Sequence, residues 1–140
     1  MHGQTNNADI TDLKKQLANF FIESKQEIIN RVTIPLNKIK NNPKDLQGFD
    51  ELINAYHSLK GVGTTYGFDV ISILGKEMEF LLKSLKISGF GSNTALINLI
   101  DLTVAFLNNF FDSTESKRLL MDKNHPVFEK IQKFKTTNRI

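Results

Sequence analysis

Apolar residues recur every three or four positions through most of this chain, and no stretch shows the alternation expected of a half-buried strand. Between residues 9 and 112 this pattern forms amphipathic segments joined by short polar or glycine-containing connections. Such segments bury their apolar stripes by packing against one another. The sequence therefore predicts an all-α protein: an antiparallel up-down four-helix bundle with a fifth helix near the C-terminus.

Turn and cap residues set the expected helix boundaries. Pro35 removes a backbone donor from the first segment, so that helix is expected either to kink there or to break in two. Gly67 is a natural left-handed cap for the second segment. Pro126, directly after His125, suits the first position of the last helix. The expected segments are 9–41, 49–66, 69 to the loop at 88–92, 93–112 and, after a short turn at 119–121, a basic helix over about 125–136.

The length and composition fit one domain. With 140 residues, 40% of them hydrophobic and eleven of them Phe, the chain can bury a sizeable core, which is expected within about residues 9–112 of a domain spanning 9–140. Residues 1–8 are polar and are expected to be disordered or to derive from an expression tag. There is no cysteine, so neither a disulfide nor a thiolate metal site is possible. Neither a signal peptide nor an apolar run near membrane-spanning length is evident, so a cytoplasmic protein without membrane insertion is expected.

The C-terminal part is basic. From residue 117 onward the chain contains seven lysines and arginines but only two carboxylates, which gives this segment a net charge of +5. Such a segment can steer an acidic partner, although a solvated helix face explains it equally simply. No arginine cluster or interleaved aromatic platform accompanies it, which argues against nucleic-acid binding.

Several enzymatic sites are excluded by their context. The glycine-rich stretch 61–67 follows a helix, whereas a dinucleotide- or phosphate-binding loop follows a strand. The three histidines are scattered, and neither His-Glu-x-x-His nor Glu-x-x-His occurs, so no metal site is expected.

One stretch carries a specific motif. His57 is followed by Lys60, Gly61 and Gly67 in the pattern H-x-x-K-G-x₅-G, inside a predicted helix. Glycine costs a helix interior about 1 kcal/mol relative to alanine, so Gly61 requires a reason. His57 is about 110° from the centre of its helix's apolar stripe, which places it on the flank of the bundle. Gly61, one turn later, would clear the surface beside the imidazole.

This stretch resembles the histidine-containing phosphotransfer (HPt) family, and most closely the N-terminal phosphotransfer domain of chemotaxis-type histidine kinases. The motif is specific between residues 55 and 82, and the helical pattern extends the resemblance over about residues 10–112. It implies that His57 is the phosphoacceptor and that Lys60 offsets the phosphoryl charge. It also gives Gly61 a clearance role and Gly67 and Thr65 structural roles.

The resemblance further implies a glutamate on the next helix that orients His57, and the matching position is Glu79. Periodicity alone also leaves Glu77 open, because the two flank the core stripe on opposite sides. Gly75, a small residue on Glu79's flank, favours Glu79 because it would let the two helices approach there.

The implied function is phosphoryl transfer in two-component or phosphorelay signalling. The implied partners are a response-regulator receiver domain, which holds its own Mg²⁺, and the catalytic domain of a histidine kinase, which supplies ATP chemistry. The chain itself is expected to be a phosphoryl carrier rather than a stand-alone enzyme and to need no cofactor. Two alternatives stay open: a helical docking module that binds a receiver or kinase without being phosphorylated, and an interaction module that uses the basic C-terminus.

A second apolar stripe is expected on the back of the third helix. Ile73, Phe80 and Ile87 repeat every seven residues opposite its core stripe, and an apolar stripe there should be covered. The C-terminal helix is the favoured cover, and a second copy of the chain is the alternative.

Overall fold

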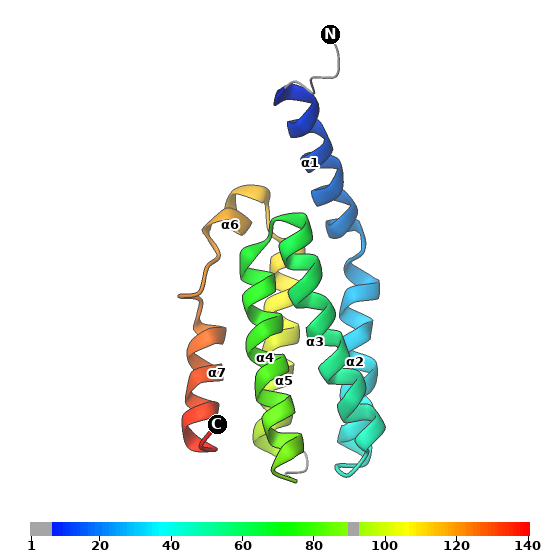
Figure 1. Ribbon diagram of the computed structural model, residues 1–140, viewed down its shortest axis with the longest axis vertical. Coiled ribbons are helices and arrows are strands. Elements are labelled where there is room, and N and C mark those ends of the chain that lie inside the picture. The colour runs from blue at the N-terminus through cyan, green and yellow to red at the C-terminus, as the bar shows by residue number, and fades with distance from the viewer. Residues whose placement is uncertain (1–6, 90–92) are drawn as a thin grey trace.

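A computed structural model describes residues 7–89 and 93–140, and it confirms the all-α prediction (Figure 1). No strand occurs in these two ranges. Helices α2 to α5 run alternately up and down, and α7 runs alongside them. The helices are α1 (Asn7–Glu23), α2 (Lys25–Asn41), α3 (Leu46–Tyr66), α4 (Asp69–Ile87), α5 (Thr94–Asp112), α6 (Glu115–Leu120) and α7 (Pro126–Thr137).

The first predicted helix is interrupted, but not at Pro35: of the two outcomes expected there, a kink or a break, the break is wrong. The chain breaks at Ser24, and Pro35 is buried inside the continuous helix α2. The Ser24 hydroxyl donates to the Phe20 carbonyl at 2.8 Å, while its backbone N–H is shared between the carbonyls of Phe20 and Phe21. A serine side chain that bonds backward in this way weakens the helix ladder, which is compatible with a break here, although Ser84 makes the same contact to Phe80 within the continuous helix α4.

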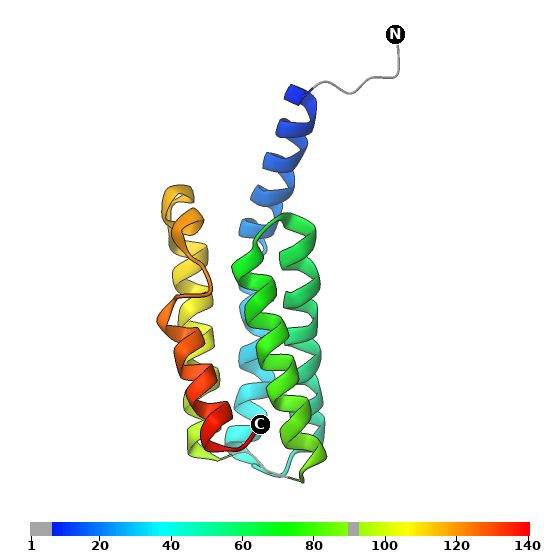
Figure 2. The ribbon, with the colours of Figure 1, turned by 60° about the vertical axis from the view of Figure 1, so that its left-hand side comes forward.

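Helix α1 begins at Asn7 and extends beyond the ends of α3 and α4, as Figure 2 shows. The expectation that its whole apolar stripe is buried is wrong, because Ile10, Leu13, Leu17 and Phe20 are exposed. Its anchor is Phe21, which is buried against the rings of Tyr66, Phe68 and Phe111. Residues 1–6 of the predicted polar N-terminus, and residues 90–92 of the predicted loop, lie outside the described ranges.

The core follows the predicted periodicity most closely in α5. The inward stripe that its helical periodicity defines is buried throughout: Leu96, Leu99, Ile100, Thr103, Phe106, Leu107, Phe110 and Phe111. By length and composition alone α5 could also cross a membrane, but a buried core helix passes the same test. Its apolar character therefore does not decide between the two.

Helix α7 is part of the core rather than an appendage to it. His125 caps it by accepting a hydrogen bond from the Val127 N–H at 3.1 Å, next to Pro126. The side chains that α7 buries against α4 and α5 are Val127, Phe128, Ile131 and Phe134. The core therefore extends past the predicted limit near residue 112.

The hypothesis that α7 covers the stripe on the back of α4 holds at one end only. Ile73 is half-buried against the core. Phe80 remains 56% exposed, with the Lys135 ammonium of α7 5.1 Å from its ring centre, and Ile87 is 88% exposed. The reason is that α7 turns its apolar face toward α5 as well as α4, and it meets Phe80 with a cation.

Helices α3 and α4 approach backbone to backbone at two glycines. A Cβ atom on Gly75 would come within 3.0 Å of α3 backbone atoms of Tyr56, Leu59 and Lys60. A Cβ atom on Gly63 would come within 3.0 Å of the α4 backbone at Ser72. In contrast, a Cβ atom on Gly61 would meet nothing within 4 Å. Packing thus requires the first two glycines and leaves the third unexplained.

We expect Gly75→Ala and Gly63→Ala to destabilise the bundle by about 2 kcal/mol or more, because the added methyl must push two helix backbones apart. Gly61→Ala is the matched control and should stabilise the fold by up to about 1 kcal/mol, since alanine is the better helix former and meets no neighbour. Urea unfolding followed by circular dichroism measures all three. Equal effects for Gly75→Ala and Gly61→Ala would contradict the close approach.

Candidate functional site

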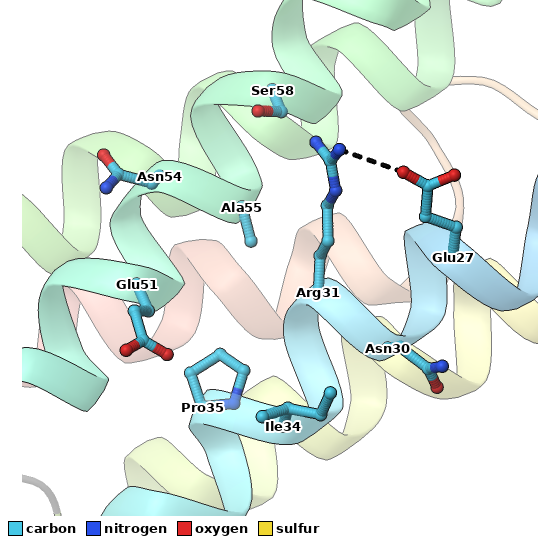
Figure 3. A pocket seen from close by; sticks show the side chains of 9 residues that line it. All are labelled: Glu27, Asn30, Arg31, Ile34, Pro35, Glu51, Asn54, Ala55 and Ser58. Carbon is cyan, nitrogen blue, oxygen red and sulfur yellow. Dashed lines mark hydrogen bonds and ion pairs between the residues drawn. The ribbon is translucent and has the colours of Figure 1, made fainter.

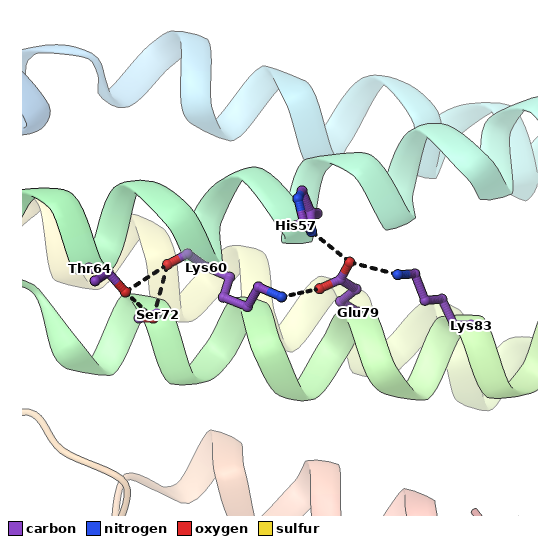
Figure 4. A network of polar contacts seen from close by, with 6 residues as sticks. All are labelled: His57, Lys60, Thr64, Ser72, Glu79 and Lys83. Carbon is purple, nitrogen blue, oxygen red and sulfur yellow. Dashed lines mark hydrogen bonds and ion pairs between the residues drawn. The ribbon is translucent and has the colours of Figure 1, made fainter.

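His57 lies on the flank of α3 that faces α4 (Figure 4). Its side chain is 62% exposed, whereas its neighbours Tyr56 and Leu59 are buried. The Tyr56 hydroxyl lies 2.6 Å from the Thr103 hydroxyl of α5, which fixes the rotation of α3 at this point. The imidazole therefore stands at the surface on a rigid element.

Glu79 of α4 lies directly against this imidazole. It is the only charged side chain that is buried within residues 9–89 and 93–140, at 8% side-chain exposure. One carboxylate oxygen, Oε2, lies 2.7 Å from His57 Nδ1. The sequence left Glu79 and Glu77 open by periodicity, and the geometry places Glu79 at the histidine. Glu77 points to the other side, where it pairs with Lys135 of α7 at 2.8 Å.

Two lysines complete the cluster around the carboxylate. Lys60 of α3 pairs with Glu79 Oε1 at 3.0 Å, and Lys83 of α4 pairs with Oε2 at 3.0 Å. Lys60 was predicted from the motif, whereas Lys83 was not. The signal for Lys83 is its position one turn after Glu79, a spacing at which opposite charges meet on a helix.

The groups that donate hydrogen bonds to Glu79 keep its carboxylate ionised, and this in turn determines which nitrogen of His57 carries a proton. Burial alone would raise the pKa of Glu79, but the hydrogen bonds from Lys83, Lys60 and His57 outweigh it and lower that pKa from 4.5 to about 2. At neutral pH Glu79 is thus a carboxylate, which can only accept hydrogen bonds. Nδ1 of His57 must therefore carry the proton that it donates. In the neutral ring this leaves an unshared electron pair on Nε2, the arrangement of a nucleophile.

The other predicted residues, Thr65 and Gly67, lie near the C-terminal end of α3 and make contacts within the helix or end it. Thr65 donates its hydroxyl hydrogen to the Gly61 carbonyl at 3.0 Å, within α3. Gly67 ends α3 in the left-handed region, with φ of 80°. The Ser72 hydroxyl donates to the Lys60 carbonyl at 2.9 Å and so ties α4 to α3 one turn beyond the site.

Two hollows flank the site. A groove of about 670 Å³ runs between α2 and α3 (Figure 3), lined by Arg31, Ile34 and Pro35 of α2 and by Asn54, Ala55 and Ser58 of α3. A smaller one of about 380 Å³ lies on the Glu79 side, and its lining includes Lys60, Lys76, Lys83 and Lys135.

Among the described residues no group of three or more histidine and carboxylate side chains could hold a metal ion. The site is thus a histidine–carboxylate pair in a basic setting.

No protein-family model matches the chain, and no solved structure is significantly similar to it.

We expect the free energy of unfolding to depend on pH through the ionisation of Glu79. The pKa of Glu79 is lower in the fold than its usual value, so its contribution is present above about pH 4.5 and is lost as the pH falls toward about 2. A shift of this size corresponds to at most about 3 kcal/mol, and solvent screening of the exposed lysines makes the contribution smaller. Glu79→Gln should remove this loss, whereas the control Glu77→Gln should retain it. Denaturant unfolding at several pH values measures the effect, and identical pH curves for wild type and Glu79→Gln would rule it out.

Proposed function

We propose that the chain is a histidine phosphotransfer protein that carries a phosphoryl group on His57. The observation that carries this proposal is the 2.7 Å contact between Glu79 and Nδ1, because it leaves the exposed Nε2 as the nucleophilic nitrogen. The resemblance of the 57–67 motif to the HPt family supports the same role. A carboxylate–imidazole pair on a rigid surface suits a group that must accept and release a phosphoryl group.

The transfer step balances with the groups at hand. The Nε2 electron pair attacks phosphorus while the bond to the donor oxygen breaks, and that oxygen leaves with the bonding electrons. The ring, still protonated on Nδ1, then carries a positive charge that the adjacent Glu79 carboxylate stabilises. In the onward transfer an aspartate of a receiver domain attacks the same phosphorus, and Nε2 leaves with its electron pair.

The two lysines have a place in this cycle. In the unmodified protein Lys60 and Lys83 hold Glu79 in its ionised form. Phosphorylation adds negative charge at Nε2, one turn from Lys60 on the same helix, and an ammonium group there offsets part of that charge. Both lysines are partly exposed, at 40% and 57%, so their side chains are free to turn toward the phosphoryl group.

A receiver domain of a response regulator and the catalytic domain of a histidine kinase are the proposed partners, in the cytoplasm. Gly61 supports docking over His57, because nothing within the described part of the chain occupies the space above it. The groove between α2 and α3 adjoins the same surface, since Ser58 lines it. Mg²⁺ would be held by the acidic cluster of the receiver, and ATP by the kinase domain.

Incubation with an active histidine kinase and radiolabelled ATP tests the assignment. We expect an acid-labile, base-stable label on the wild-type protein and its loss in His57→Gln. The control His125→Asn, which retains a side chain able to cap α7, should keep the label. Glu79→Ala should be labelled about tenfold more slowly or worse, because the ring loses the group that orients it and balances its charge. A label that persists in His57→Gln would refute the proposal, and binding to a receiver without any label would support the docking alternative.

Gly61→Ala separates docking from folding. The substitution should leave the fold intact or more stable, because its Cβ meets nothing within 4 Å. It should nevertheless slow transfer to a receiver by about 5- to 150-fold, since a methyl group forced into a close-packed contact costs about 1–3 kcal/mol. Single-turnover transfer from phosphorylated protein to a receiver measures this. An unchanged rate would remove the clearance role from Gly61 without affecting the role of His57.

A further inference from the structure

Helix α1 presents an apolar seam that the bundle does not cover. Ile10, Leu13, Leu17 and Phe20 are between 38% and 60% exposed along one face of the helix. The helix is anchored near its C-terminal end, where Phe21 packs against Tyr66. Its N-terminal part extends past the ends of α3 and α4 (Figures 1 and 2), so a second helix can approach the seam there.

The spacing of the seam is that of a coiled coil. Its members follow one another at intervals of three, four and three residues, which are the a, d, a and d positions of two heptads. Ile10 then occupies an a position and Leu13 a d position. A β-branched residue at a with leucine at d favours two parallel strands, and the first heptad follows this preference, whereas the second, with Leu17 at a and Phe20 at d, does not.

The charges beside the seam match those of an identical parallel helix. Asp9 lies at a g position and Lys14 at the following e position, the two positions that meet across a parallel dimer. In an antiparallel pair, Lys14 would lie near Lys14 of the other copy, and Asp9 near its Glu23. All three side chains are exposed, so the parallel arrangement pairs opposite charges and the antiparallel one pairs like charges.

We propose that two copies of this chain associate through α1 as a short parallel coiled coil. A membrane surface fits the same face less well. Helix α1 carries two lysines against three carboxylates, a net charge of −1, whereas helices that bind membrane surfaces are rich in lysine and arginine. Two heptads make a small interface, so the dimer is weak and concentration-dependent.

This dimer leaves the phosphotransfer site accessible. The base of α1 contacts Tyr66, which lies nine residues beyond His57 on α3, about 14 Å at 1.5 Å per residue. Phe20 lies beside this anchor, with its ring 6.4 Å from that of Tyr66, and the other three residues of the seam lie further out along α1. The proposal is therefore independent of the function proposed for His57.

The absence of cysteine from the chain allows a direct test. Leu13→Cys places a thiol at a d position, where the two copies of a parallel dimer lie close enough for a disulfide. Lys15→Cys, an exposed f position on the side of α1 away from the seam, is the matched control. Under mild oxidation we expect at least tenfold more covalent dimer from Leu13→Cys than from Lys15→Cys. Equal yields, or efficient crosslinking only when Leu13→Cys is mixed with Leu17→Cys, would overturn the parallel dimer.

Light scattering provides a second readout on the unlabelled protein. The weight-average mass of the wild type should rise toward that of a dimer between about 1 and 500 μM, the affinity range of small interfaces. Leu17→Glu should remain monomeric with an unchanged circular dichroism spectrum, because the residue lies outside the core, and His57 labelling should be unaffected. A wild type that stays monomeric across this range, or that binds anionic phospholipid vesicles as a monomer through α1, would refute the proposal.

Discussion

The close approach of α3 and α4 is the constraint on which the candidate site depends. At Gly75 the two helix backbones leave no room for even a methyl group, and the α3 atoms they meet belong to Tyr56, Leu59 and Lys60. His57 lies within this same turn of α3. Glu79 is one turn beyond Gly75, so the crossing brings its short side chain within 2.7 Å of the imidazole. A wider spacing of the helices would leave the carboxylate out of reach.

Burying a carboxylate at this crossing is costly unless it is fully paired. Glu79 satisfies this condition with three donors: His57, Lys60 and Lys83. Even so, a buried ion pair commonly adds less to stability than apolar side chains of the same volume would. A buried carboxylate with a strongly lowered pKa, in contact with an exposed histidine, is instead typical of a site that performs chemistry.

The fold could be predicted from the sequence where a local pattern of apolar residues is enough to determine which side of a helix is buried. The stripe of α5 is buried as expected because all of its neighbours lie within the bundle. The break in the first helix was predicted at Pro35, because proline is the residue whose effect on a helix can be read from the sequence. It lies at Ser24 instead, where the side-chain contact to the Phe20 carbonyl depends on a rotamer that the sequence does not specify. Periodicity marks the apolar face of α1 but not what covers it, so its exposure could not be foreseen. Lys83 was missed because its role depends on a carboxylate whose partner lies on another helix.

Three of the four glycines in α3 and α4 differ in what packing requires of them. Gly63 and Gly75 each admit the backbone of the facing helix, and their conformational cost is offset by that packing. Gly61 bears the same cost of about 1 kcal/mol in a helix interior, yet no side chain or backbone in the described part of the chain fills its space. Under the proposed function, the receiver domain that docks over His57 would fill this space. Because Gly61 lies one turn from His57 on the same exposed flank, a partner that reaches the imidazole also passes over the glycine.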